Sequence, residues 1–405
     1  MALTADDRRS IESVALETGF DLAGLAAVPD PSEAAADDQR FAGWVASGAA
    51  GEMDWLTRRD PGGNLVRGDL RRSVPWARSV LVCAVNYNTA APRSIDPAPS
   101  GTGWIARYAW SGQGTGGMAP PDGDAPQTTP GSDYHEELLP KLKAIAAQLK
   151  DRFACETRAY VDTGPILERG YAARAGVGWI GRNTCVLNQQ LGSWLLLGVV
   201  VTSLDLAPEA VPVPAADRCG TCTRCIDACP TDALHGSGLE GSPRLMDASR
   251  CIAYLTIEKK GSIDPELREG VGRQVFGCDI CQDVCPWNRR APVGASGMLE
   301  PRHALVNPSL AWLATLDGPA FNRWFRGSPL ERTRRKRLLR NVAIAMGNSR
   351  EAGFRQQLET WTGSEDPVLA QTAAWALARL SLESAPSLIP SLPLEPEAAS
   401  VGPLD

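Results

Sequence analysis

Residues 219–230 read Cys-Gly-Thr-Cys-Thr-Arg-Cys-Ile-Asp-Ala-Cys-Pro, which places four cysteines at the spacing C-x2-C-x2-C-x3-C-P. This spacing is typical of proteins with two [4Fe–4S] clusters, in which the first three thiolates hold one cluster and the fourth holds the other. A zinc ion is a poor alternative, because three cysteines at successive two-residue gaps would crowd one tetrahedral site. The stretch therefore predicts two clusters and a protein that transfers electrons.

A second run, residues 278–286, reads Cys-Asp-Ile-Cys-Gln-Asp-Val-Cys-Pro and lacks the first cysteine of the pattern. Cys251 lies between the two runs and can supply the missing ligand. The eight cysteines then form two sets of four. The predicted ligands are Cys219, Cys222, Cys225 and Cys285 for cluster one, and Cys229, Cys251, Cys278 and Cys281 for cluster two. The isolated residues Cys83, Cys155 and Cys185 are interpreted as structural.

The bulk properties suit a globular protein of two or three domains, because 43% of the 405 residues are apolar. No apolar run reaches the ~20 residues of a membrane helix. The chain begins Met-Ala-Leu-Thr-Ala-Asp-Asp, without the basic and apolar parts of a signal peptide. We therefore expect a cytoplasmic protein that makes no membrane contact and, because cytosolic thiols stay reduced, no disulfides.

The net charge of −6 provides no general attraction for nucleic acid. One segment differs from this average, because residues 323–340 contain eight Lys or Arg and a single acid, Glu331. Clustered cations of this kind neutralise phosphates, although they can also form an ordinary solvated helix face.

Local patterns predict a mixed α/β domain in the first 215 residues. A capping box at Thr4 begins a helix that is expected to stop before Gly19. Apolar runs at residues 79–85 and 194–201 predict two buried strands.

Further along the chain, a helix is expected over residues 133–149, with a kink or a restart at Pro140. Gly, Pro, Ser and Thr dominate residues 111–132, which favours a mobile surface loop. Beyond the cysteines, two helices with Ala-rich faces are expected, one closed by Gly347 and one capped by Asp366. Two such helices suggest a short helical-repeat unit.

Several longer stretches resemble one known family. Residues 160–169 read Tyr-Val-Asp-Thr-Gly-Pro-Ile-Leu-Glu-Arg, and residues 175–183 read Ala-Gly-Val-Gly-Trp-Ile-Gly-Arg-Asn. With residues 250–258 and 276–287, they resemble epoxyqueuosine reductase, and the likeness extends over roughly residues 5–385. The resemblance implies an enzyme that reduces epoxyqueuosine to queuosine at the wobble position of tRNA, the last step of queuosine synthesis.

The resemblance also implies an α+β architecture with cobalamin and two [4Fe–4S] clusters as cofactors. A nitroreductase-like, cobalamin-binding catalytic domain is expected over residues 1–215, and a ferredoxin-like two-cluster domain over residues 216–295. A HEAT-like helical domain that contacts tRNA is expected over residues 296–385. A flexible tail is expected over residues 386–405.

Site residues carry over by position in the shared motifs. Asp162 matches the proton donor of the family, which protonates the oxygen that leaves the epoxide. The expected cobalamin contacts are Arg67, Ala106, Asp162, Val186, Asn188, Leu197, Cys278, Asp279, Ile280 and Cys281. The expected tRNA contacts are Lys259 and Arg169 from the resemblance, and Arg334, Arg335 and Arg337 from the basic segment.

The expected partners are tRNA that carries epoxyqueuosine and an external low-potential electron donor of the flavodoxin or ferredoxin type, and the chain is expected to be a monomer. One alternative is a corrinoid reductive dehalogenase, which shares the cofactors but acts on small organohalides. That class typically has a twin-arginine signal and lacks a basic helical extension, which is the reverse of this sequence. A second alternative is a plain electron carrier whose amino-terminal domain only docks partners.

Overall fold

The computed structural model describes residues 2–111, 133–236, 244–295 and 301–381. Its largest sheet has four antiparallel strands in the order β2-β3-β8-β5. The strand bounds are Leu22–Ala27 for β2, Ser79–Asn86 for β3, Leu195–Thr202 for β8 and Thr157–Tyr160 for β5. The two strands predicted from apolar runs are the central pair β3 and β8. Both are covered on two faces, which explains why they read as continuous rather than alternating apolar runs.

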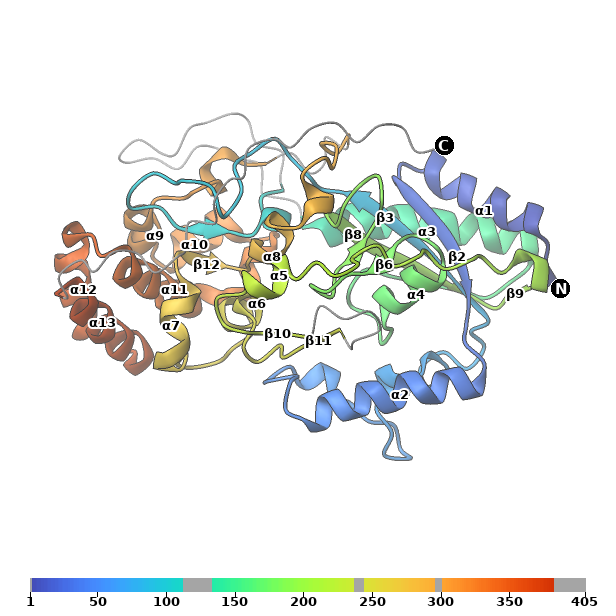
Figure 1. Cartoon of the computed structure of the whole chain (residues 1–405), viewed down its shortest axis with the longest axis horizontal. Coiled ribbons are helices and arrows are strands. Elements are labelled where there is room, and N and C mark those ends of the chain that lie inside the picture. The colour runs from blue at the N-terminus through green and yellow to red at the C-terminus, as the bar shows by residue number, and fades with distance from the viewer. Residues whose placement is uncertain (1, 112–132, 237–243, 296–300, 382–405) are drawn as a thin grey trace.

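Helices cover both faces of this sheet (Figure 1). On one face, α1 (Ala5–Glu17) and α3 (Tyr134–Phe153) pack against Leu81 and Val85 of β3. On the other face, α4 (Glu168–Arg174) packs near Val80 and Val82. The alternation follows from the two-residue period of a strand. Cys83 belongs to the first set and is fully buried, so its interpretation as a structural residue holds.

The capping box that was predicted at the start of α1 is present. The backbone N–H of Asp7 donates to Thr4 Oγ1 at 3.2 Å, and the N–H of Thr4 donates to Asp7 Oδ2 at 3.1 Å. Helix α3 is continuous through Pro140 and extends to Phe153, so the expected alternative of a restart at Pro140 was wrong. Leu138 and Leu142 are both completely buried, so packing on the sheet holds the helix together across the missing backbone hydrogen bond.

Gly347 was expected to end its helix, but the helix continues past it. Helix α11 runs over Arg334–Ser349, and a Cβ on Gly347 would lie 2.8 Å from Ala376 of α13 (Pro367–Leu380). The glycine therefore permits close contact between the two helices. Helix α13 begins as predicted, with Asp366 Oδ1 accepting a hydrogen bond from the N–H of Val368.

The remaining elements are short and connect the sheet to the carboxy-terminal helices. The helix bounds are Pro31–Ala46 (α2), Arg224–Asp227 (α5), Ile252–Ile257 (α6), Pro265–Val271 (α7), Ile280–Asp283 (α8), Leu310–Thr315 (α9), Gly318–Phe325 (α10) and Arg355–Thr362 (α12). The strand pairs are Ala2–Leu3 (β1) with Asp205–Leu206 (β9), Trp179–Ile180 (β6) with Val186–Leu187 (β7), Leu234–His235 (β10) with Leu245–Met246 (β11), and Trp104–Ile105 (β4) with Gln274–Phe276 (β12). In Figure 1 the helices α5 and α8, which contain Cys225 and Cys281, and α6, which Cys251 precedes, lie between the sheet and the helical end.

One hydrophobic core connects segments that are far apart in the sequence. Trp104 and Trp110 pack with Phe276 and with Leu338 and Val342 of α11. The antiparallel sheet with separate helices confirms the predicted α+β class. The domain boundaries remain predictions, and the loop over residues 112–132 and the tail over 386–405 fall outside the described residues. Within the described ranges, no helix has the length and apolar character needed to cross a membrane.

Candidate active site and cluster ligands

Asp162 lies just after β5, with φ at +54°. Aspartate tolerates this left-handed conformation better than most side chains. Its Oδ2 accepts a hydrogen bond from the Tyr134 hydroxyl at 3.2 Å and lies 3.8 Å from Nη1 of Arg332. The carboxyl side chain is 57% exposed, so it is accessible to a bound substrate.

A second carboxyl group, that of Glu168, holds the backbone of the Asp162 loop. The backbone N–H of Asp162 donates to Glu168 Oε1 at 3.0 Å. Burial raises the pKa of Glu168 to about 8, and the negative charge of Asp162 adds to this, while the hydrogen bond from Asp162 and the charge of Arg67 oppose it. Glu168 is therefore largely protonated at neutral pH in the isolated chain. Glu168 lies within the motif of residues 160–169, from which no role for it was predicted.

Arg67 lies beside these carboxyls. Its Nη1 donates to the carbonyl oxygen of Ile166 at 2.9 Å, and burial lowers its pKa, opposed by the charges of Glu168 and Asp162. Its buried Nε has no hydrogen-bond partner in the described part of the chain. A buried N–H of this kind would donate to an acceptor on a bound molecule, which fits a ligand rich in amide oxygens such as cobalamin.

Two tyrosines lie between the Asp162 loop and the second cysteine run. The rings of Tyr108 and Tyr134 meet edge to face with centroids 6.1 Å apart. Burial raises the pKa of both hydroxyls, so both stay neutral and able to donate. The negative charges of Asp162 and Asp279 both act on Tyr108 and add to the rise in its pKa. The predicted proton donor and the predicted cofactor loop therefore face the same region of the protein.

Asp279 and Ala106 are brought together by the pairing of β4 with β12. Asp279 accepts hydrogen bonds from Trp104 Nε1 at 3.0 Å and from the N–H of Arg107 at 2.7 Å. The N–H of Ala106 donates to the carbonyl oxygen of Phe276 at 2.7 Å. Burial raises the pKa of Asp279, and the nearby Asp283 raises it further.

Three other expected cofactor contacts pack or form hydrogen bonds within the protein itself. Val186 and Leu197 belong to the apolar cluster that includes Ile166. Asn188 holds its own loop, because its Nδ2 donates to Val177 and its Oδ1 accepts from the N–H of Gln190. Its amide is thereby committed to the protein, so any contribution of Asn188 to a ligand would come through packing.

The cysteines gather as two groups in space. The thiols of Cys285, Cys219 and Cys222 lie close enough to Cys225 to raise its pKa by charge repulsion. The thiols of Cys251 and Cys229 act on Cys278 in the same way, and Cys281 lies beside Cys278 and Cys251. Both groups consist of thiolate donors suited to iron–sulfur clusters. Cys185, interpreted as structural, lies next to the second group.

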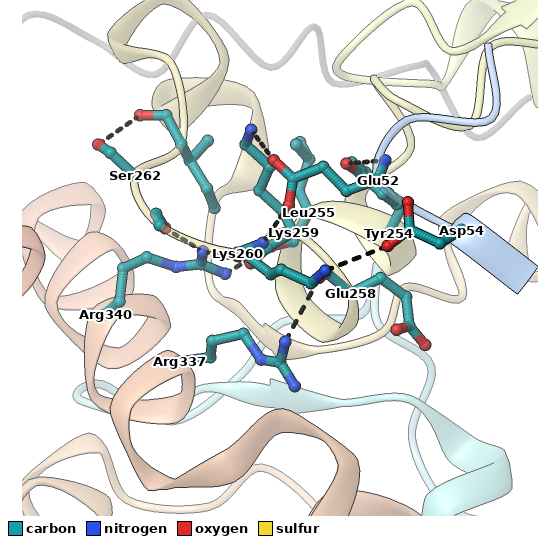
Figure 2. Close-up of polar contacts among 12 residues, drawn as sticks. Glu52, Asp54, Tyr254, Leu255, Glu258, Lys259, Lys260, Ser262, Arg337 and Arg340 are labelled. Atoms are coloured by element: carbon teal, nitrogen blue, oxygen red, sulfur yellow. Dashed lines mark hydrogen bonds and ion pairs between the residues drawn. The ribbon is translucent and has the colours of Figure 1, made fainter. Parts of the chain in front are cut away.

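Lys259, an expected tRNA contact, is engaged within the protein (Figure 2). Its Nζ lies 2.5 Å from Glu52 Oε1, while Glu52 Oε2 accepts from the N–H of Lys260. Arg340 is 1% exposed and donates to the carbonyl oxygens of the same loop, including that of Lys259. A phosphate that binds Lys259 would therefore compete with Glu52.

The basic segment is divided between inward and outward cations. Arg337 points partly inward, because its Nη1 donates to the carbonyl oxygen of Glu258 at 3.4 Å. Arg334 and Arg335 are exposed, although Arg335 Nε also donates to the carbonyl oxygen of Leu316. Arg169 is exposed as well, and its guanidinium donates to the carbonyl oxygen of Thr184 at 2.9 Å.

Sequence reasoning missed Arg332, although it lies within the basic segment. Its Nη2 is 3.1 Å from Nε2 of His135, and its Nη1 faces Asp162. No local pattern distinguishes it from its neighbours, since the contact depends on η9 (Pro329–Thr333) packing near the start of α3. The helical part of the chain thus contributes a cation to the candidate active site.

Two cysteine groups, the second of them on the side of an exposed, hydrogen-bonded carboxyl, define an iron–sulfur oxidoreductase. Residues 218–288 match the family model of a 4Fe-4S double cluster binding domain, and residues 67–163 match the model "Epoxyqueuosine reductase QueG, DUF1730". The chain belongs to the epoxyqueuosine reductase family, because the relatives of that name match almost along its whole length. The family resemblance and the prediction of two [4Fe–4S] clusters are thereby confirmed.

Among these relatives, the protein from Synechocystis is 38% identical over 75% of this chain and 93% of that protein. The protein from Escherichia coli is 32% identical over 92% of this chain and 89% of that protein. A crystal structure of epoxyqueuosine reductase with an epoxyqueuosine-modified tRNA-Tyr stem loop superposes with a TM-score of 0.74 and 26% identity, covering 92% of this chain and 89% of that chain. The structure from Streptococcus thermophilus gives 0.73 and 27%, covering 92% and 90%.

The hydrogen bond from Tyr134 to Asp162 leads to a direct prediction. Tyr134→Phe should reduce turnover on the order of tenfold, because one hydrogen bond to a charged group contributes ~1.5 kcal/mol or more. The neighbouring Tyr108→Phe is the matched control, since no hydrogen bond of the Tyr108 hydroxyl is found among the described residues. Single-turnover reduction, normalised to bound cofactor, is the measurement. Equal rates for the two variants would show that the hydroxyl does not position Asp162.

Proposed function

We propose that this protein reduces epoxyqueuosine to queuosine at the wobble position of tRNA, with Asp162 as the proton donor. Membership of the epoxyqueuosine reductase family supports the reaction. The observation that carries the assignment of the site is the exposed Asp162 carboxyl, held by Tyr134 and faced by Arg332, with Tyr108 near enough to feel the charges of both Asp162 and Asp279. The corrinoid dehalogenase alternative has no comparable support along the chain.

The reaction converts an epoxide into an alkene, which takes up two electrons and two protons and releases one water. Cobalamin, when bound, supplies the reducing chemistry at the epoxide carbon. Its proposed contacts are Arg67, Ala106, Asp162, Val186, Asn188, Leu197, Cys278, Asp279, Ile280 and Cys281. Asp162 supplies a proton at the departing oxygen, and the Tyr134 hydroxyl holds the carboxyl in place. The carboxylate that remains after proton transfer faces the guanidinium of Arg332.

Electrons arrive through the two cysteine groups, which we propose hold one [4Fe–4S] cluster each. The group that contains Cys278 and Cys281 is nearer the site, because Asp279 between them has Tyr108 as a neighbour. We also propose that the protein works as a monomer in the cytoplasm and receives electrons from an external low-potential carrier of the flavodoxin or ferredoxin type.

The decisive test of the reaction is mass analysis of tRNA nucleosides from cells that lack this protein. Epoxyqueuosine should accumulate, and a plasmid copy of the gene should restore queuosine. Normal queuosine in the deletion strain would contradict the proposal. A corrin absorption spectrum in the cobalamin-reconstituted protein would exclude the plain electron carrier.

The proposed tRNA surface is tested by the exposed cations of α11. Arg334→Glu combined with Arg335→Glu should weaken tRNA binding and flatten its salt dependence by roughly one unit of slope for each lost phosphate contact. Cofactor content should not change. The matched control is Arg9→Glu with Arg40→Glu, two exposed arginines on α1 and α2. If tRNA affinity and salt slope equal those of the parent, α11 presents only a solvated face.

A further inference from the structure

The first cysteine group is surrounded by exposed positive charge that the proposed reaction does not use. Arg218 precedes Cys219, and Arg289 and Arg290 follow Cys285 by four and five residues; all three are exposed. The Trp287 Nε1 donates to the carbonyl oxygen of Arg218 at 3.4 Å, so the two segments lie side by side. Within the described residues, none of the three arginines has an ion pair.

Acidic residues hardly offset this charge. The segments 217–230 and 286–295 contain two acids, Asp217 and Asp227. Asp217 forms an ion pair with Arg244, and Asp227 accepts a hydrogen bond from the Thr223 hydroxyl. The chain as a whole has a net charge of −6, so this positive surface opposes the charge of the whole protein.

A surface hollow of about 260 Å³ lies beside these cations, lined in part by Trp179, Gln190 and Arg218. The Trp179 Nε1 donates to Cys219 Sγ at 3.4 Å, and the Trp179 ring meets the Trp287 ring edge to face at 5.1 Å. A molecule that enters the hollow would therefore come close to the first cysteine group. No residue of the second cysteine run, residues 278–286, lines the hollow.

From these features we infer that the surface formed by Arg218, Arg289, Arg290 and the hollow over Trp179 is the docking face for an acidic, one-electron carrier protein. The inference rests on the proposed function, because it supplies the electrons for that reaction. Each encounter transfers one electron from the reduced partner to the first cluster, so that two encounters provide the two electrons of one epoxide reduction. Complementary charge steers such encounters and raises their rate.

The test measures reduction of the clusters in the oxidised holoprotein by a reduced acidic flavodoxin, in the absence of oxygen and of tRNA. The variant Arg218→Glu/Arg289→Glu/Arg290→Glu should lower the second-order rate constant on the order of tenfold or more at low salt. Its rate should also lose most of the salt dependence seen for the parent. Reduction by dithionite, which needs no docking, should be unchanged, and the iron content should equal that of the parent.

The control variant reverses three exposed arginines on the helical end, Arg323, Arg326 and Arg355, and should behave like the parent. Equal slowing by both triple variants, or no slowing by the first, would overturn the docking face. The neutral variant Arg218→Gln/Arg289→Gln/Arg290→Gln, which disturbs packing less, should show a smaller effect in the same direction. Failure of the proposed function would appear separately, as a dithionite-reduced holoprotein that does not reduce epoxyqueuosine.

Discussion

Replacing Asp162 with Asn is expected to lower the rate of epoxyqueuosine reduction by ~10²–10⁴-fold, the usual contribution of general acid catalysis. Asparagine keeps the size of the side chain and can still accept the hydrogen bond from Tyr134, but it has no proton to transfer. The loss should therefore appear in turnover rather than in tRNA affinity. Single-turnover reduction of epoxyqueuosine-containing tRNA, normalised to bound cobalamin and iron, is the measurement.

The matched control is Asp54→Asn, which changes an exposed aspartate that pairs with Lys260 on the surface. It should retain the turnover of the parent. A purely structural Asp162 would behave differently, since its replacement would reduce stability and cofactor content, with activity falling in the same proportion. Parental turnover in a fully loaded Asp162→Asn protein would end the assignment of the proton donor.

Cys251→Ala is expected to abolish reduction altogether and to remove one of the two clusters. Cys251 is the ligand that neither sequence run supplies, and its thiol lies beside those of Cys229 and Cys278. Iron should fall from about eight to about four atoms per chain, the content of one [4Fe–4S] cluster. Because the affected group is the one near Tyr108 and Asp279, electrons should no longer reach the site.

Cys155→Ala is the control for this experiment. Cys155 follows the carboxy-terminal end of α3, where its thiol contacts the carbonyl oxygen of Leu149. Its replacement should leave iron content and activity as in the parent. If Cys251→Ala retained about eight iron atoms and full activity, another residue would be the fourth ligand.

Much of the site could be predicted from the sequence because its signals are local. Cluster cysteines lie two or three residues apart, so one short loop can present several of them to one cluster. The capping boxes and apolar runs of α1, β3 and β8 are equally local. The motif of residues 160–169 identified Asp162, although the strand that precedes it, β5, was not predicted.

Predictions failed where packing overrode a local preference. A kink or a restart was expected at Pro140 of α3, of which the restart is wrong, and Gly347 was expected to end α11. In both cases the burial of the helix against its neighbours outweighs the intrinsic cost of the residue, which is ~1 kcal/mol for glycine and ~3 kcal/mol for proline. The sequence shows which residue disfavours a helix, but it does not show the packing contacts that compensate for that residue.

The environment of Asp162 depends on contacts between distant segments, which no local pattern encodes. Tyr134 starts α3, Arg332 lies on η9 some 170 residues after Asp162 (332 − 162), and Glu168 reaches the Asp162 backbone from α4. Tyr134 reaches the site because it shares an apolar core with Val161, and Arg332 because a second core packs its neighbour Leu330 with Trp104 and α11. Spacing along the chain specified the donor atoms and their chemistry. Burial of apolar surface between remote segments determined which charges face one another, because that burial is the main favourable term in folding.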